Sequence, residues 1–185
     1  MSSDIPTVSE NETSANRIAV NDANLFIDLC EIDLVEIFFE LPLEFHTTQL
    51  ILNELEEDQL QRLVPFIAQK QLSVRHLTQS EIDNLASIST QSRKLSREDL
   101  SVYFYAHELD NCMILTGDNR LRKEAQRQGF EVHGILWVFE QLVNIEVLSP
   151  LIASEKLREL MSINFWLPVG ECDKLIEKFN LDHIK

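Results

Sequence analysis

Short apolar runs alternate along the chain with longer segments whose apolar residues recur at helical spacing. The runs are IAV (18–20), FHTT (45–48), LSVRHL (72–77), CMILT (112–116) and FEVHG (130–134). Each run has the length of a β-strand, and the segments between them are long enough for helices. Strands that alternate with helices predict a parallel sheet covered by helices on both faces. The pattern therefore predicts an α/β fold with five strands.

Local signals within the intervening segments predict where helices begin and end. Thr78 and Ser96 are each followed three residues later by an acid, which is the spacing of a capping box. A break is expected near Ile32 or Asp33. Pro65 is expected to end or kink its helix unless it lies in the first turn, because proline lacks the backbone N–H.

The chain is predicted to contain one folded domain. Its 185 residues are 44% hydrophobic, which is enough for a single core. Residues 1–16 are polar and are predicted to be a disordered tail. Residues 17–148 are expected to form the domain itself. Residues 149–185 contain two amphipathic stretches, which we expect to be a C-terminal helical extension packed on the same domain.

Charge argues against a protein that holds nucleic acid through its overall field. The chain has 31 acids and 16 bases, for a formal net charge of −15, whereas such binding needs basic residues that displace counterions. Any phosphate contact must then be local, and seven of the basic residues lie between positions 93 and 127. The candidate RNA-phosphate contacts are Arg93, Lys94, Arg97, Arg120, Lys123 and Arg127. The alternative is that they form an ordinary solvated surface.

Other compositional features exclude further classes of protein. Apolar stretches long enough to span a membrane are missing, and the first residues lack the pattern of a secretory signal, so we expect a cytoplasmic protein. The three cysteines are odd in number and far apart, which fits neither a disulfide framework nor a zinc site.

Four acids are predicted to meet at one edge of the sheet. Asp22 and Asp118 each follow a predicted strand directly, and the carboxyl ends of parallel strands share the edge where ligands bind. Glu54 is expected within a helix, on its inward face. Asp99 is expected to face inward from the start of another helix.

Four carboxylates at one edge repel one another unless they are protonated or share a cation. An open cluster of oxygen ligands suits Mg²⁺. Asp22 and Asp118 are the best candidates for direct ligands, whereas Glu54 and Asp99 could bind a second ion or orient water. Each acid alone also has a simpler interpretation, either as a helix cap or as part of a solvated helix face.

The stretches around these acids resemble a known family. VNDANLFIDL, LILNELEE, LSREDLSVYFYA and ILTGDNRLRKEA resemble, in order, the four acidic signatures of the PIN-domain nucleases. The stretch QGFEVHGILWVFEQL resembles the bacterial, VapC-like toxin branch of that family. The resemblance covers residues 17–148. It implies a three-layer α/β/α sandwich around a mainly parallel five-stranded sheet.

The resemblance also implies a site and a reaction. Carried over residue by residue, Asp22, Glu54, Asp99 and Asp118 would form the acidic quartet, with Asn24 and Thr116 as supporting polar residues. The expected cofactor is one or two ions of Mg²⁺ or Mn²⁺, and the expected activity is endonucleolytic cleavage of single-stranded or structured RNA. A homodimer and a cognate antitoxin protein are the further partners expected for a toxin.

Two other functions are weighed against this one. The strong overall acidity motivates one of them, a binding module that keeps the PIN fold but has lost catalytic turnover. A phosphoryl-accepting receiver domain shares the alternating pattern, but it predicts paired acids after the first strand and a lysine after the last. VNDAN contains one acid and EVHGI contains no lysine, which disfavours the receiver domain.

Overall fold

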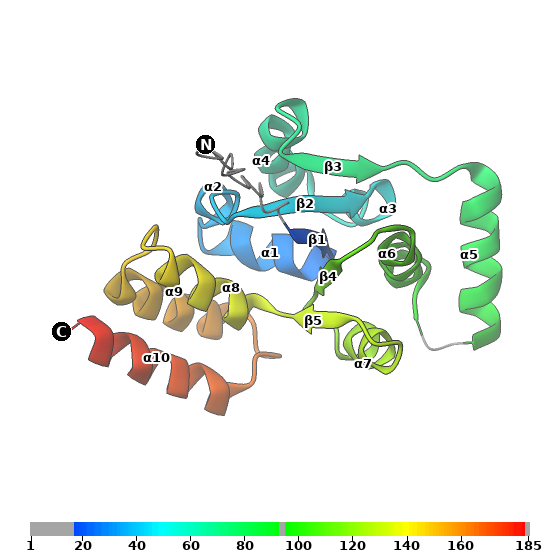
Figure 1. The fold of residues 1–185 in the computed structure, drawn as a ribbon. Helices are drawn as coiled ribbons and strands as arrows, with labels where there is room; N and C mark the ends of the chain where they lie inside the picture. Colours follow the sequence, from blue (N-terminus) through cyan, green and yellow to red (C-terminus); the bar gives the residue numbers. More distant parts are fainter. Residues whose placement is uncertain (1–16, 93–94, 184–185) are drawn as a thin grey trace, which may run out of the picture.

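The computed structural model describes residues 17–92 and 95–183 (Figure 1). The predicted disordered tail, residues 1–16, and the candidate phosphate contacts Arg93 and Lys94 lie outside the described residues. Among the described helices, none is both long and apolar enough to cross a membrane.

One parallel sheet forms the centre of the fold. Its strands are β1 (Arg17–Asn21), β2 (Leu43–Thr48), β3 (Leu72–Arg75), β4 (Cys112–Leu115) and β5 (Glu131–His133). They are arranged in the order β3-β2-β1-β4-β5, and every pairing is parallel. All five predicted strands are confirmed. The four residues of β4 are all buried, as expected for a strand covered on both faces.

Helices cover both faces of the sheet, which confirms the predicted α/β/α layers (Figure 1). On one face α6 packs against β1, β2 and β4, and α7 packs against β5 and α6. On the other face α4 packs against β3 and α1. The helices are α1 (Ala23–Glu31), α2 (Val35–Phe38), α3 (Gln49–Leu52), α4 (Glu57–Ala68), α5 (Gln79–Ser92), α6 (Arg97–Glu108), α7 (Asn119–Arg127), α8 (Ile135–Asn144), α9 (Pro150–Ile163) and α10 (Val169–His183).

The strand order creates a topological switch point between β1 and β4. The chain leaves β1 toward β2 on one side and leaves β4 toward β5 on the other side. In open parallel sheets, ligands bind in the crevice outside the carboxyl ends of strands at such a point. The N–H of Asp22 donates to the carbonyl of Leu115 over 3.0 Å, so the residues that follow β1 and β4 meet there.

The local helix signals are confirmed at three places. Asp33 has a φ of 54°, in the left-handed region, and separates α1 from α2. Ser96 and Asp99 form the predicted capping box at the start of α6. Thr78 and Glu81 exchange the corresponding hydrogen bonds before α5. Each signal is local, so its outcome depends little on the rest of the fold.

Pro65 does not end its helix, so that part of the expectation is wrong. The break in its segment falls between α3 and α4, and Pro65 lies within α4, which continues to Ala68. Proline removes one helical hydrogen bond, to the carbonyl of Gln61. Gln61 is exposed, and water can therefore hydrate that carbonyl. The proline is tolerated because the missing hydrogen bond lies on the solvent-facing side of α4.

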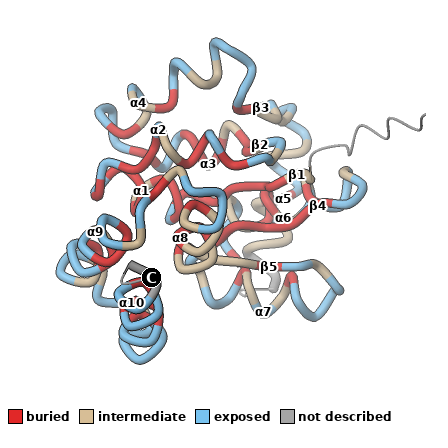
Figure 2. Tube along the Cα trace, turned by 60° about the vertical axis from the view of Figure 1, so that its left-hand side comes forward, coloured by how far each residue is buried: buried red, intermediate tan, exposed pale blue. Residues whose placement is uncertain are grey.

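The C-terminal helices α9 and α10 pack against each other, and α9 also packs against α8. Figure 2 shows that their outer surfaces are exposed, whereas the sheet and α1 are largely buried. The turn between them is attached to α1, because the amide of Asn164 donates to Oδ1 of the buried Asp28 over 2.9 Å. Trp166 in the same turn is 95% exposed.

Asn164→Ala is expected to destabilise the protein more at pH 8 than at pH 5. Burial raises the pKa of Asp28 from 3.8 to about 6, and the hydrogen bond from Asn164 opposes that rise. Above the raised pKa the buried carboxylate is ionised and depends on this donor. Its removal should lower the free energy of unfolding by about 1–2 kcal/mol. Urea unfolding at both pH values measures the difference, with the exposed Asn144→Ala as the matched control. Equal losses at both pH values would contradict the prediction.

Candidate active site

Asp22 lies at the switch point and is 2% exposed. It is the N-cap of α1, and its Oδ1 accepts a hydrogen bond from the N–H of Ala23 at 2.8 Å. Its Oδ2 accepts from Oγ1 of Thr116 at 2.6 Å and from the amide of Asn24 at 3.4 Å. The capping interpretation of Asp22 is therefore correct, but it uses only one of the two carboxylate oxygens.

Thr116 connects the loop after β4 to the loop after β1. Its hydroxyl donates to Asp22 and accepts from the N–H of Asp118 at 2.9 Å. Asp118 is the N-cap of α7, where its Oδ1 accepts from the N–H groups of Arg120 at 2.7 Å and Leu121 at 2.8 Å. The structure thus brings Asp22, Thr116 and Asp118 together, although the Asp118 carboxylate is also directed toward its own helix.

Arg122 fixes the position of Thr116 from the other side. Its Nη2 donates to the carbonyl of Thr116 at 2.7 Å, and its Nη1 donates to the carbonyl of Val132 at 3.2 Å. Burial lowers the pKa of its guanidinium. A Cβ atom at Gly134 would lie 2.9 Å from Nη2, so glycine leaves the space that the guanidinium occupies.

Sequence reasoning counted Arg122 in the basic cluster but did not place it in the site. A usable signal was present, because Arg122 precedes Ala125 by three residues and lies beside Leu121. Both of those apolar residues are fully buried. A basic residue near the apolar face of a helix needs acceptors inside the protein.

Glu54 lies outside a helix, contrary to expectation. Helix α3 ends at Leu52, and Glu54 sits in the turn that leads to α4, where its N–H donates to the carbonyl of Ile51 at 3.1 Å. Thr48 caps the start of this short helix, and Asn53 is its C-cap, so Glu54 already lies beyond the helix end. The side chain of Glu54 is therefore positioned by a turn rather than by a helix face.

Asp99 occupies the third position of α6. Its Oδ2 accepts from the N–H of Ser96 at 2.8 Å, and its own N–H donates to Oγ of Ser96 at 2.9 Å. The residue is half-buried. As with Asp22, the capping role does not remove Asp99 from the switch point, because its charge acts on Asp22 there.

Electrostatic coupling shows which acids lie near one another. Burial raises the pKa of Asp22 to about 6; the hydrogen bond from Thr116 opposes this rise, and the charge of Asp99 adds to it. The pKa of Glu54 is raised to about 7. Partial desolvation of its carboxyl is the largest cause even though the residue is exposed overall, and the charges of Asp22, Glu98 and Asp99 follow. Three members of the predicted quartet therefore share one negative field.

The donor set fits a hard divalent cation in its chemistry. It consists of carboxylate and amide oxygens, which are the ligands that Mg²⁺ and Mn²⁺ accept. The amide oxygen of Asn21, fully buried at the end of β1, makes no hydrogen bond within the described residues. However, those residues contain no preassembled group of three ligating acid, histidine or cysteine side chains. Cation binding would require Asp99 and Asp118 to share or leave their helix caps.

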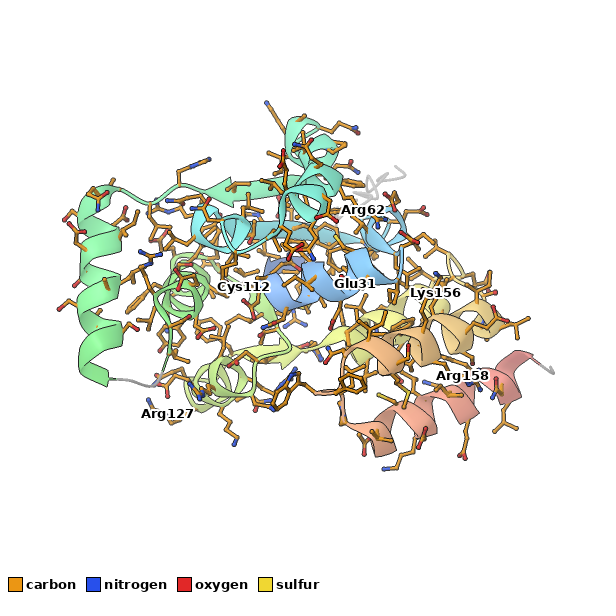
Figure 3. All side chains as sticks on the ribbon, turned by 180° about the vertical axis from the view of Figure 1, so that it is seen from behind. Glu31, Arg62, Cys112, Arg127, Lys156 and Arg158 are labelled. Carbon is orange, nitrogen blue, oxygen red and sulfur yellow. The ribbon has the colours of Figure 1, made fainter. Side chains whose placement is uncertain are left out.

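The predicted phosphate contacts lie in different surroundings. Arg97 pairs with Glu98 at 2.6 Å, and its positive charge lowers the pKa of Glu54, so it lies beside the acids. Arg127 pairs with Glu124 at the outer surface of α7, where Figure 3 shows it at the edge of the molecule. Arg120 and Lys123 are exposed on the same helix. Among the candidates within the described residues, Arg97 is the one whose charge acts on Glu54.

A doubly wound parallel sheet with carboxylates at its switch point places this chain among the open α/β proteins, a class whose ligands bind outside the carboxyl ends of the strands. Comparison with protein families identifies that class more closely. The sequence profile described as a PIN domain matches residues 18–181. The chain therefore belongs to the PIN-domain family, whose members are generally nucleases and typically use divalent metal ions. The match extends through α9 and into α10. Comparison with curated proteins gives no match.

Proposed function

We propose that this protein is an Mg²⁺- or Mn²⁺-dependent endoribonuclease. The observation that carries the proposal is the buried Asp22 carboxylate at the switch point, with Asp99 and Glu54 within electrostatic reach. Such an arrangement opposes folding when the acids are ionised. A cation bound between the acids, together with a substrate phosphate, would offset this repulsion.

Each acid has a role that follows from its position. Asp22 and Asp118 are the proposed direct ligands, because they follow β1 and β4, and Glu54 and Asp99 would hold a second ion or orient water. Bound cations would lower the pKa of a coordinated water and stabilise charge on the phosphate. Thr116 keeps Oδ2 of Asp22 in one orientation.

Glu54 is also suited to accept a proton. Its pKa of about 7 is close to neutral pH, where a general base is most effective. The Glu54 carboxylate can take a proton from the attacking water as the water oxygen bonds to phosphorus; the bond from phosphorus to the leaving oxygen breaks, and that oxygen takes a proton from solvent. Arg97 lies beside Glu54 and can contact the phosphate. We infer that Glu54 acts on the attacking water, whereas Arg97 binds the negatively charged phosphate of the substrate.

The biological setting is proposed from the family resemblance. The protein would act in the cytoplasm as the toxin of a toxin–antitoxin pair, as a homodimer restrained by a cognate antitoxin protein. Its RNA would follow local basic residues, with Arg97, Arg120 and Lys123 as the described contacts and Arg93 and Lys94 as further predicted ones. The strongly acidic remainder of the surface supports local rather than general binding.

Glu54→Gln is expected to lower RNA cleavage by about 100-fold, because the amide cannot accept the proton. An internally labelled single-stranded RNA is incubated with the purified protein in Mn²⁺ or Mg²⁺, and with EDTA as the metal-free control. Glu57→Gln removes a nearby exposed acid at the start of α4 and should cleave like the wild type.

The wild-type rate should rise with pH while Glu54 ionises. A bound cation lowers the pKa of this carboxyl, so the plateau should begin at or below pH 7. The proposed reaction would be excluded if several RNAs stayed intact with either metal, with the protein folded and free of inhibitory partners. An equal loss of cleavage in Glu54→Gln and Glu57→Gln would exclude the proposed role of Glu54 but not the nuclease activity.

A second candidate is a PIN-fold binding module without turnover. The observation in its favour is that Asp99 and Asp118 both use their carboxylates in helix caps. This function predicts RNA or protein binding that Asp22→Asn leaves unchanged, with cleavage missing from the wild type. The same assay, extended by a binding measurement, separates the two candidates.

A further inference from the structure

A small cavity of about 180 Å³ lies between α5 and α6, beyond the carboxyl end of β3. Figure 1 shows α5 standing alongside α6 on this side of the molecule. The apolar part of its lining comes from Leu77, Leu85, Phe104 and Tyr105. Pockets for drug-sized ligands are usually larger, about 300–1,000 Å³. This cavity therefore suits a single flat ring system.

The cavity shares a wall with the candidate active site. Ser101 lines it, and the Ser101 hydroxyl bonds the hydroxyl of Thr48 at 2.7 Å, at the residue that caps α3. The same hydroxyl donates to the carbonyl of Glu98 at 2.7 Å. Glu98 and Asp99 occupy the turn of α6 just before Ser101. Ser101 therefore connects the cavity to the turn of α6 that carries Asp99.

The charges in the cavity disfavour a phosphate group inside it. Arg75 lies between Glu81, at 2.8 Å from Nη2, and Glu108, at 3.1 Å from Nε. Two acids against one base leave the lining with a net negative charge. Carboxylate oxygens favour a neutral ring that carries N–H donors, and the exposed ring of Phe104 offers a face for stacking.

Asn84 supplies a means of distinguishing one base from another. It lies on the α5 side of the cavity and is exposed, so its amide is accessible to a bound base. An asparagine amide can pair with adenine through the exocyclic N6 donor and the N7 acceptor. Single-stranded RNA presents these atoms freely, because its bases can be splayed out.

We propose that this cavity binds one unpaired adenine of the RNA, stacked on Phe104 and read by Asn84, beside the scissile phosphate. This subsite rests on the proposed nuclease function and specifies the substrate of that site. It gives an acidic protein a way to select RNA through a base rather than through phosphate charge.

The test measures binding without cleavage. Two fluorescent seven-nucleotide RNAs, one all uridine and one with a central adenine, are titrated with the full-length wild-type protein in EDTA. The adenine-containing RNA should bind about tenfold more tightly. Asn84→Ala should bring the two affinities within about twofold. Phe104→Ala should weaken binding of the adenine-containing RNA by about tenfold, through lost stacking. Asn144→Ala, which changes an exposed residue on α8, should retain the preference.

Each outcome bears on the cavity separately from catalysis. Equal binding of both RNAs, no binding of either, or a preference that survives Asn84→Ala would overturn the proposal. A change of oligomeric state in Phe104→Ala, with the adenine preference intact, would instead identify the cavity as a protein interface. An adenine preference that Asn84→Ala removes, in a protein without cleavage activity, would support the subsite while refuting the nuclease. Thermal unfolding confirms that each variant is folded.

Discussion

Asp22→Asn is expected to abolish RNA cleavage and to make the protein more stable at pH 8. The carboxylate is nearly fully buried, and its pKa is raised from 3.8 to about 6. The ionised form therefore opposes folding above pH 6. A shift of this size corresponds to about 1.4 kcal/mol per pKa unit. Allowing for altered hydrogen bonds, the neutral amide should gain about 1–2 kcal/mol of stability. Cleavage should fall by at least about 100-fold, because a proposed cation ligand is lost.

The stability gain should depend on pH in a defined direction. An acid whose folded-state pKa is raised contributes most stability below its unfolded pKa, and that stability is lost as pH rises through the folded pKa. The gain from Asp22→Asn should therefore be largest above pH 6 and absent near pH 4. Urea unfolding across this range measures it, with the exposed Asp58→Asn as the control. A variant that is less stable at pH 8, or that still cleaves RNA, would contradict the prediction.

Cation binding should differ between the wild type and Asp22→Asn. A ligand that binds only the folded state, present at a hundredfold excess over its Kd, stabilises by about 2.7 kcal/mol. Mn²⁺ should therefore raise the unfolding temperature of the wild type, and relief of the repulsion among Asp22, Glu54 and Asp99 should add to this effect. Asp22→Asn should respond weakly. An equal response would place the cation away from Asp22.

Arg122→Met is expected to lower the free energy of unfolding by about 2–4 kcal/mol and to reduce cleavage by about tenfold or more. The guanidinium donates to the carbonyls of Thr116 and Val132, and methionine would leave the carbonyls of these two buried residues without that donor. The loop that carries Thr116 and Asp118 would then loosen. Arg122 is a positioning residue, because it bonds the backbone of the loop at Thr116 and the backbone of β5 at Val132.

A purely structural role can be separated from positioning by the titration of Asp22. The hydrogen bond from Thr116 lowers the pKa of Asp22. If Arg122 holds Thr116 in place, that pKa should rise in Arg122→Met, as measured by NMR of the carboxyl carbon in the folded variant. Arg120→Met, at an exposed position of the same helix, should change neither stability nor pKa. An unchanged pKa alongside lost stability would refute the positioning role.

Gly134→Ala provides an independent test of the same contact. The added Cβ would lie 2.9 Å from Nη2 of Arg122 and 3.3 Å from the carbonyl oxygen of Thr116. The guanidinium must therefore shift, and the variant should reproduce the direction of the Arg122→Met effects. Retention of wild-type stability and cleavage would show that the side chain adapts without moving Thr116.

Local sequence was sufficient for most of the secondary structure. Strand β4 was recognisable because a strand buried on both faces consists of apolar residues throughout. The capping boxes were recognisable because their partners lie three residues apart. The errors at Pro65 and Glu54 have one cause. The break between α3 and α4 depends on where the chain turns back toward β3, and the capping box that follows it, Glu56 with Gln59, has glutamate in place of the usual serine or threonine.

The sequence by itself determined that Asp22 and Asp118 follow the central strands, and therefore that they meet at one edge of a parallel sheet. It could do so because strand ends and sheet direction depend on local patterns and short connections. Only the tertiary structure decided how these side chains are used. The hydrogen bond between Thr116 and Asp22 joins residues 94 positions apart, and the role of Arg122 depends on the space beside Gly134. The orientation of a polar side chain is set by the acceptors and donors that packing brings to it, and these come from distant parts of the chain.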